Sequence, residues 1–175
     1  IDNFNKPIKS LNMNELKIYT PNIFKDSRGF FFEVFNKKNF TNNIEFVQDN
    51  ISFSHKNVLR GLHIQIDPME QGKFIRVLKG SIFDVAVDLR KKSPSYGVYK
   101  SFILDDINNN ALWIPPGFAH GFLSTSVEVI TQYKTTNFYS PQHERTIAWN
   151  DPGIGIDWPI SDISALIISD KDKKG

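Results

Sequence analysis

The stretch VLRGLHIQ, residues 58–65, decides the fold class, because it is a short apolar run with polar side chains set inside it. Residues 82–89, IFDVAVDL, repeat this pattern with a period of two, which is the side-chain period of a β-strand. Similar runs, separated by Gly, Pro, Asn and Asp, predict strands over residues 30–35, 46–53, 58–65, 74–78, 82–89, 99–104, 111–114, 121–123 and 127–135. An all-β domain of this kind forms two packed antiparallel sheets or a closed barrel, and a jelly roll is the most economical choice.

The composition limits the class of protein. A length of 175 residues predicts a single domain over residues 1–175. Lys and Arg number 21 against 19 Asp and Glu, and the resulting net charge of +2 is too small to favour nucleic acid or an anionic membrane as a partner. The lack of Cys excludes disulfides and thiolate chemistry. Without a long apolar run or a signal-like start at residues 1–3, the sequence predicts a cytoplasmic protein with no membrane span.

The polar residues between the runs predict the local turns. Lys79-Gly80-Ser81 is typical of a tight hairpin, because Gly tolerates the positive φ that such turns need. The polar cluster at residues 105–110 indicates a second turn of this kind. One or two helical turns are expected, for example at residues 37–41.

Two acids lie inside the predicted strand 82–89. Asp84 and Asp88 share one parity, opposite the face of Phe83, Val85 and Val87 that we expect to enter the core. We expect Asp88 to cap the strand end in solvent. Asp84 lies deeper in the strand and therefore needs a partner.

Polar residues inside strands are the candidates for chemistry, since the sequence contains no Gly-rich phosphate loop, HExxH pair or Gly-x-Ser-x-Gly elbow. Strict alternation puts Arg60 and His63 on opposite faces. They share a pocket only if the strand is bulged or twisted near Gly61, which the Gly favours. A hairpin-type return would bring Lys73 beside His63. His63 can equally be a hydrogen-bonded rim histidine, and Lys73 an edge lysine that guards against aggregation.

His120 and Tyr133 likewise have both a functional and a structural interpretation. His120 follows the rigid turn at residues 115–119, which fixes its position. Tyr133 lies in mid-strand with Thr131 and Thr135 on its face. Either residue can be functional or structural, because buried tyrosines usually belong to the core with their hydroxyl group satisfied.

The same residues argue against a metal site. Jelly rolls of the cupin type bind a divalent ion through a His-x-His pair, a Glu and a further His. Here Gln65 stands where the second His would be, and Lys73 lies near the position of the Glu. One imidazole, an amide and a cation do not satisfy Zn, Fe or Mn, which need three or more neutral or anionic ligands. We therefore predict no metal.

Several motifs together resemble those of the dTDP-4-dehydrorhamnose 3,5-epimerase family. They extend from about residue 19 to residue 172, nearly the whole chain. They are DSRGFFFE (26–33), FVQDN (46–50), NVLRGLHIQ (57–65), QGK (71–73), FDVAVD (83–88), LWIPPGFAHGF (112–122), YSP (139–141), WND (149–151) and IDWP (156–159). The resemblance implies a metal-free cupin jelly roll without a cofactor. It also implies a homodimer in which a strand of each subunit joins the sheet of the other.

The resemblance further implies roles for particular residues. His63 would be the general base and Tyr133 the acid on the opposite face of the sugar. Lys73 would stabilise the enolate, with Arg60 and His120 nearby. In the signature Ser169-Asp170-Lys171-Asp172, the acid that orients the base would be Asp172. The nucleotide of the dTDP-sugar would rest on Arg28, Glu33, Gln48, Asn50, Glu144 and Lys171, with Tyr139 stacked on the thymine.

The expected reaction is epimerisation at C3 and C5 of dTDP-4-dehydro-6-deoxy-D-glucose, which gives dTDP-4-dehydro-L-rhamnose for L-rhamnose synthesis. The C4 ketone acidifies both neighbouring C–H bonds, so that one base and one acid can invert both centres through an enolate. An epimerase that inverts C3 alone is an alternative. A non-catalytic sugar-nucleotide-binding cupin and a metal-dependent cupin oxygenase are two others.

Overall fold

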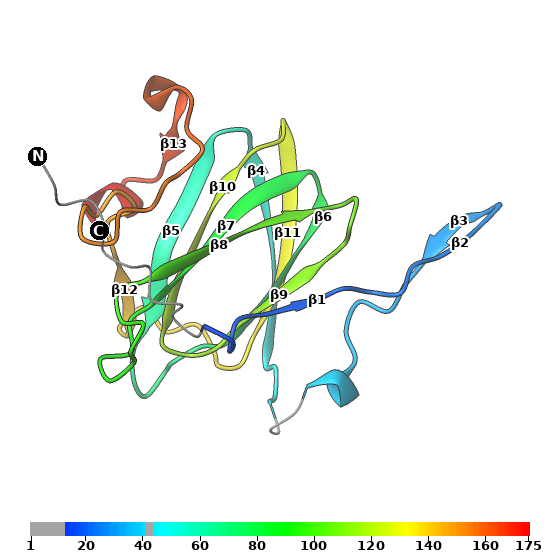
Figure 1. Ribbon diagram of the computed structural model, residues 1–175, viewed down its shortest axis with the longest axis horizontal. Coiled ribbons are helices and arrows are strands. Elements are labelled where there is room, and N and C mark those ends of the chain that lie inside the picture. Colours follow the sequence, from blue (N-terminus) through cyan, green and yellow to red (C-terminus); the bar gives the residue numbers. More distant parts are fainter. Residues whose placement is uncertain (1–12, 41–43) are drawn as a thin grey trace, which may run out of the picture.

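The computed structural model describes residues 13–40 and 44–175, which form two packed β-sheets and a projecting hairpin (Figure 1). The strands are β1 (Lys17–Tyr19), β2 (Phe24–Asp26), β3 (Gly29–Phe31), β4 (Gln48–His55), β5 (Val58–Gln65), β6 (Lys73–Lys79), β7 (Ser81–Asp88), β8 (Tyr99–Asp105), β9 (Ala111–Ile114), β10 (Phe118–Ser124), β11 (Glu128–Thr135), β12 (Glu144–Thr146) and β13 (Ile167–Ile168). Three short 3₁₀ helices are η1 (Lys37–Asn39), η2 (Ile163–Ala165) and η3 (Asp172–Lys174). The prediction of an all-β jelly roll of the cupin type is confirmed.

Most strands that follow one another in the sequence lie in opposite sheets. One sheet has the order β1-β9-β6-β11-β4, and the other β12-β5-β10-β7-β8, with β13 added parallel to β5. From β4 to β7 and from β8 to β12, each strand therefore crosses to the sheet opposite its predecessor. The predicted hairpins at Lys79-Gly80-Ser81 and at residues 105–110 are wrong for this reason, although both segments do turn the chain. Gly80 has the positive φ expected of it, +82°, but it joins β6 to β7 across the two sheets.

The two faces of β7 pack into two core clusters, one between the sheets and one on the outer face of its sheet. Ile82 and Ala86 of this strand pack into the interior cluster, together with Ile75 of β6. Val85 and Val87 point the other way and pack beneath the C-terminal segment, which covers the outer face of that sheet. The expectation that Val85 and Val87 enter a core on the face opposite the acids is therefore confirmed, although this core is the outer cluster. Both faces of β7 are buried, and the acids share the interior face.

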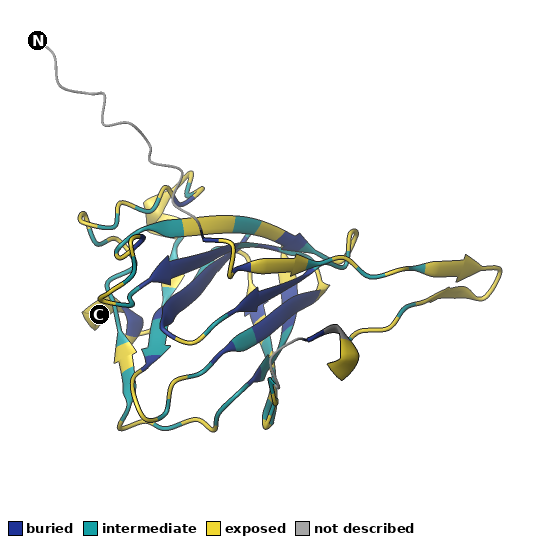
Figure 2. Cartoon of the chain, turned by 60° about the horizontal axis from the view of Figure 1, so that its bottom comes forward, coloured by how far each residue is buried: buried dark blue, intermediate teal, exposed yellow. Residues whose placement is uncertain are grey.

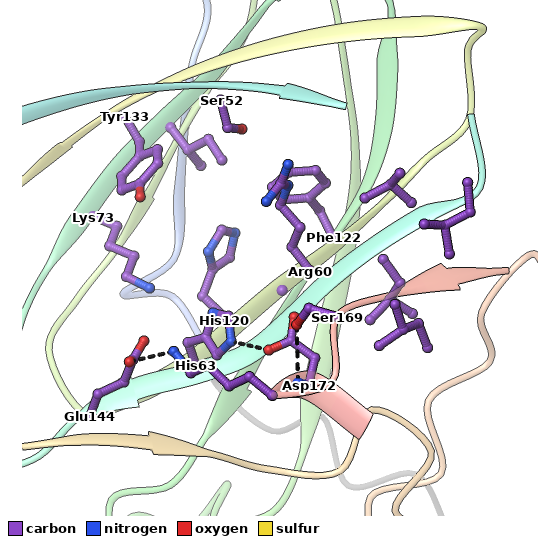
Figure 3. Close-up of a pocket in the computed structure, with 17 residues that line it drawn as sticks. Ser52, Arg60, His63, Lys73, His120, Phe122, Tyr133, Glu144, Ser169 and Asp172 are labelled. Carbon is purple, nitrogen blue, oxygen red and sulfur yellow. Dashed lines mark hydrogen bonds and ion pairs between the residues drawn. The ribbon is translucent and has the colours of Figure 1, made fainter. Parts of the chain in front are cut away.

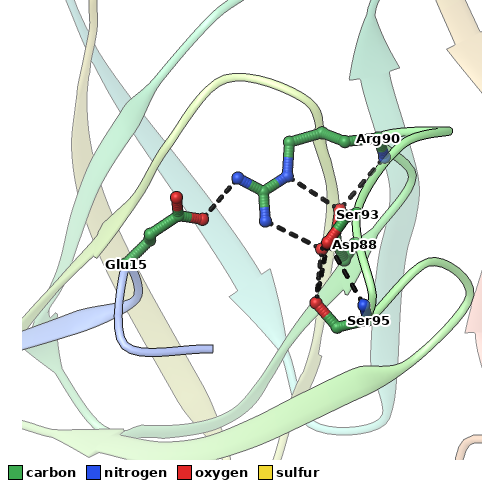
Figure 4. A network of polar contacts seen from close by, with 5 residues as sticks. All are labelled: Glu15, Asp88, Arg90, Ser93 and Ser95. Atoms are coloured by element: carbon green, nitrogen blue, oxygen red, sulfur yellow. Dashed lines mark hydrogen bonds and ion pairs between the residues drawn. The ribbon is translucent and has the colours of Figure 1, made fainter. Parts of the chain in front are cut away.

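The prediction that Asp88 lies in solvent is wrong, because its side chain is completely buried. The loop between β7 and β8 folds back over it (Figure 4). One carboxylate oxygen accepts from Arg90 Nε at 2.9 Å, and the other accepts from Ser93 Oγ at 2.5 Å and Ser95 Oγ at 2.6 Å. Burial alone would raise the pKa of Asp88, but these donors hold it well below its usual value. Arg90 also pairs with Glu15, which ties the segment before β1 to this end of the barrel.

An arm stands away from the sheets (Figures 1 and 2). It is the β2–β3 hairpin, on which Phe24, Phe30 and Phe31 are 65 to 70% exposed. The predicted strand 30–35 begins here, but its strand conformation ends at Phe31. The helical turn predicted at residues 37–41 is found as η1, and Thr41 lies outside the described residues. Among the described residues, no helix is long and apolar enough to cross a membrane.

Candidate active site

A cavity of about 600 Å³ opens between the two sheets (Figure 3). This volume lies in the range of small-molecule sites. Strands of both sheets and the C-terminal segment supply its walls. The expected site residues that line it are Arg60, His63, Lys73, His120, Tyr133, Glu144, Lys171 and Asp172. Ser52, Ile75, Phe122 and Ile168 are further lining residues that the sequence patterns did not single out.

His63 is held by an acid 109 residues away in the sequence. Its Nε2 atom lies 2.6 Å from Asp172 Oδ1, and the other carboxylate oxygen accepts the Gly61 N–H at 3.2 Å. Asp172 is 4% exposed, whereas the Asp170 side chain points into solvent and pairs with Lys173. Burial lowers the pKa of His63, although Asp172 acts to raise it, so the imidazole is neutral at pH 7. The neutral ring donates from Nε2 to Asp172 and leaves the Nδ1 lone pair free to accept a proton.

Arg60 and His63 share this cavity because β5 is irregular between them. The pairing of β5 with β10 shifts register between His120 and Phe122, opposite Gly61, whose φ is +111°. A Cβ atom at Gly61 would lie 2.6 Å from the Cα atom of Gly121 on β10. The close approach of two glycines therefore allows the irregularity. The expected bulge or twist near Gly61 is confirmed.

We predict that Gly61→Ala destabilises the protein by about 3 kcal/mol or more, because it combines a left-handed backbone with contact against β10. Gly97 is the matched control, since its φ is +78° and no atom lies within 4 Å of a Cβ added there. Gly97→Ala should cost only about 1 kcal/mol. Denaturant unfolding of both variants gives the two free energies. Equal costs would show that the close approach at Gly61 is unimportant.

Lys73 and Tyr133 enter the cavity from the sheet opposite His63. Thr135 pairs with Lys73 and Tyr133 with Ile75, so that Lys73 and Tyr133 share the interior face of neighbouring strands β6 and β11. The hairpin-type return expected to bring Lys73 beside His63 is wrong, since β5 and β6 lie in different sheets. Lys73 nevertheless reaches the same cavity by facing His63 across it (Figure 3).

Burial sets the protonation states of these two groups. It lowers the pKa of Lys73 to about 8, against the raising effect of Asp84 and Glu144. It raises the pKa of Tyr133, although Arg60 acts to lower it. At neutral pH the lysine is therefore mostly an ammonium ion and the tyrosine is a neutral phenol, so both carry protons in the cavity.

A second group of expected residues gathers at the rim. Tyr139 donates from its hydroxyl to Glu144 Oε2 at 2.9 Å, and Lys171 pairs with the same oxygen. Burial would raise the pKa of Glu144, but these two donors lower it. Gln48 Oε1 accepts the Tyr139 N–H at 3.0 Å, and Gln48 Nε2 donates to Asn50 at 2.8 Å. Gln48 and Asn50 do not line the cavity, but they share the interior face of β4 with Ser52, which does.

Two expected residues lie far from this cavity within one chain. Arg28 is at the tip of the arm, where its side chain is 88% exposed and pairs with Asp26 at 2.5 Å. Glu33 lies at the base of the arm and accepts from Asn36 Nδ2 at 3.0 Å. Strand periodicity does not indicate whether a residue on this arm contributes to the site of its own subunit or to the site of another subunit.

The cavity does not offer a metal-binding set of ligands. Across residues 13–40 and 44–175, no group of three or more His, Cys, Asp or Glu side chains converges. His63 and His120 each already contact one acid, Asp172 and Asp84 respectively. The Asp84 partner expected from the sequence is thus His120, whose Nε2 atom lies 2.8 Å from Asp84 Oδ2.

Comparisons with known proteins match this chain to one family. A family model described as dTDP-4-dehydrorhamnose 3,5-epimerase matches residues 10–175. The protein of that name from Methanothermobacter thermautotrophicus is 50% identical over 159 residues, which cover 89% of this chain and 85% of that one. The one from Shigella flexneri is 49% identical over 165 residues, or 92% and 90% of the two chains.

Solved structures of two epimerases in complex with dTDP-sugars also match this chain. The dTDP-6-deoxy-D-glucose-3,5-epimerase of Legionella pneumophila, in complex with dTDP-4-keto-L-rhamnose, matches with a TM-score of 0.89 and 44% identity over 93% of this chain and 87% of that one. A 3′-monoepimerase from Streptomyces bikiniensis, in complex with dTDP-quinovose, matches with a TM-score of 0.84 and 31% identity over 91% and 81%.

Proposed function

The chain belongs to the dTDP-4-dehydrorhamnose 3,5-epimerase family, and we propose that it converts dTDP-4-dehydro-6-deoxy-D-glucose to dTDP-4-dehydro-L-rhamnose by inverting C3 and C5. The observation that best supports this proposal is that a neutral imidazole and a neutral phenol lie on opposite sides of one cavity. His63 belongs to one sheet and Tyr133 to the other, with a cavity of about 600 Å³ between them. A sugar ring in this cavity would meet a base on one face and an acid on the other.

The proposed reaction begins with removal of a proton next to the C4 ketone. The Nδ1 atom of His63 takes the proton, and the electron pair of the broken C–H bond moves to the C4 oxygen as an enolate. Asp172 stabilises the imidazolium that forms, because its carboxylate lies 2.6 Å from Nε2. The Lys73 ammonium ion stabilises the negative oxygen in a cavity that is partly closed to water.

The second half of the reaction delivers a proton to the opposite face. The Tyr133 hydroxyl donates to the carbon, the enolate electrons form the new C–H bond, and the configuration is inverted. The imidazolium and the tyrosinate then exchange protons with solvent and return to their starting states. Repetition at the other carbon inverts the second centre. No electron leaves the substrate in either step, so the proposed chemistry is redox-neutral.

The test is turnover in deuterium oxide. Wild-type protein is incubated with dTDP-4-dehydro-6-deoxy-D-glucose while the C3 and C5 proton signals are followed by NMR. The proposal predicts loss of both signals and formation of the L-rhamno product. Loss of the C3 signal alone would identify a C3-only epimerase. Binding without any loss would identify a sugar-nucleotide-binding protein, and either result would contradict the proposal.

We also propose that the chain forms a homodimer by exchanging the arm. In a single chain, β4 is an edge strand with Ile51 68% and Phe53 47% exposed, and edge strands with apolar side chains invite pairing. The arm carries exposed phenylalanines of its own. Exchange would bury both surfaces and bring Arg28 to the phosphates of the nucleotide bound by the second copy.

A mixing experiment tests whether Arg28 acts in the second copy. Arg28→Ala and His63→Ala variants are denatured together and refolded, so that about half of the dimers are mixed. Each mixed dimer would contain one complete site, and activity should return to about a quarter of the wild-type value. Mixing His63→Ala with Lys73→Ala is the control, because both residues line one cavity and no site becomes complete. Failure of the first mixture to recover activity would contradict arm exchange.

A further inference from the structure

Asp84 is a buried acid beneath the cavity that the proposed reaction does not use. It lies midway along β7 on the interior face, between Ile82 and Ala86, and is 0% exposed. Its strand neighbour on β10 is Phe122, which lines the cavity. An isolated carboxylate in such a place is costly unless charges or donors compensate it.

Only one of the two oxygens of the Asp84 carboxylate accepts a hydrogen bond. Oδ2 accepts from His120 Nε2 at 2.8 Å, whereas Oδ1 is buried and has no hydrogen-bond partner among the described residues. A carboxylate that only structural packing required would have both oxygens satisfied, as Asp88 does on the same face of the same strand. The free oxygen of Asp84 therefore requires an explanation.

Lys73 supplies the complementary charge. Its side chain lines the cavity, and no ion pair joins it to an acid within the described part of the chain; Figure 3 draws none among the lining residues. Asp84 is the acid that most strongly raises the pKa of Lys73, against a larger lowering effect of burial. The Asp84 carboxylate thus stabilises the charged form of Lys73.

We propose that Asp84 is a positioning residue that keeps Lys73 protonated at neutral pH and fixes the His120 ring against the cavity floor. Asp84 does not touch the substrate. It acts through His120 and Lys73 on the site where the C4 oxygen of the sugar becomes negative. The inference rests on the proposed function for the role of Lys73 in catalysis. The charge coupling between Asp84 and Lys73 is independent of turnover.

Other charged groups surround the pair. On the strand beside Asp84, Lys100 of β8 is exposed and lies over the Phe102 ring. The titratable and charged groups that line the cavity are Arg60 and His63 of β5, Lys73 of β6, His120 of β10, Tyr133 of β11, Glu144 of β12, and Lys171 and Asp172 of the C-terminal segment. Of these, Glu144 also raises the pKa of Lys73 and Lys171 lowers it, but both are engaged with each other.

The test compares Asp84→Asn with a matched variant. Loss of the Asp84 charge should lower the pKa of Lys73 from about 8 by about one further unit. The alkaline limb of the kcat/KM profile should move down by the same amount, so that activity falls about fourfold more at pH 8 than at pH 6.5. Asp88→Asn also removes a buried acid from the same face of β7. It should lower the Tm but leave the alkaline limb in place.

A direct titration of Lys73 separates this inference from the proposed function. Lysines are methylated with ¹³C-formaldehyde, the Lys73 signal is assigned by its loss in Lys73→Arg, and its chemical shift is followed against pH. The inference predicts a midpoint near 8 in the wild type and about 7 in Asp84→Asn. The same midpoint in both proteins, or an equal shift in Asp88→Asn, would overturn it, whether or not the protein turns over substrate. If Asp84→Asn does not fold, a wild-type midpoint below about 7 overturns it, since Asp84 then fails to hold the charge.

Discussion

His63→Ala is expected to lower kcat/KM by about a thousandfold or more and to abolish deuterium exchange at both C3 and C5. Removing the imidazole removes the group to which both proton abstractions are assigned. It also leaves Asp172 as a buried carboxylate without its partner. Asp172 cannot replace the base, because it sits behind the ring and is only 4% exposed.

The exchange assay in deuterium oxide measures this effect at each carbon separately. His55→Ala is the control, since His55 is exposed on β4 and lies outside the cavity. It should exchange both protons at the wild-type rate. If His63→Ala lost exchange at one carbon only, a second base would have to act at the other carbon, and the account of a single base would be wrong.

Lys73→Met is expected to lower kcat/KM by about a hundredfold to a thousandfold, while the substrate still binds. Methionine keeps the length and burial of the side chain but removes the charge that stabilises the enolate oxygen. Because that charge is needed most in the transition state, the loss should fall mainly on kcat.

Steady-state kinetics with the 4-keto sugar nucleotide separates kcat from KM. Lys79→Met is the matched control on the same strand, because Lys79 lies at the far end of β6 and pairs with Glu128 at 2.6 Å outside the cavity. A loss confined to KM would show that Lys73 binds the substrate without stabilising the reaction intermediate.

Strand periodicity predicted much of the fold and part of the site. The parity of Thr131, Tyr133 and Thr135 correctly puts them on one face of β11, and the Gly61 signal correctly predicts an irregular strand that lets Arg60 share a cavity with His63. These features depend on residues close in sequence. Alternation and glycine placement are local properties, so a sequence can display them directly.

The relative positions of residues that are far apart in the sequence were harder to predict. Gly80 tolerates the same positive φ in a hairpin and in a crossover between sheets, so the turn residue alone could not distinguish the two. Asp88 was expected in solvent because nothing local indicates that Ser93 and Ser95 fold back over it. The pairing of His63 with Asp172 came from the resemblance to a family, since no spacing rule joins residues so far apart. Under the proposed arm exchange, Arg28 would reach a site only in a second copy of the chain.

We propose that His63 and Tyr133 act on opposite faces of one sugar ring, and the Tyr133→Phe variant separates the two roles. This change removes the proton donor but keeps the base, so deuterium should still enter from the His63 side while inversion is impaired. Tyr99→Phe is the control, because the Tyr99 hydroxyl lies outside the cavity and bonds the Asp157 N–H.

The decisive measurement is the ratio of deuterium exchange to inversion at C5 in the Tyr133→Phe variant, followed by NMR in deuterium oxide. We expect that exchange remains measurable and that the deuterated substrate mostly keeps its original configuration, so that the ratio rises about tenfold or more above the wild-type value. Loss of exchange and inversion to the same extent, with the ratio unchanged, would contradict the division of the reaction between one base and one acid.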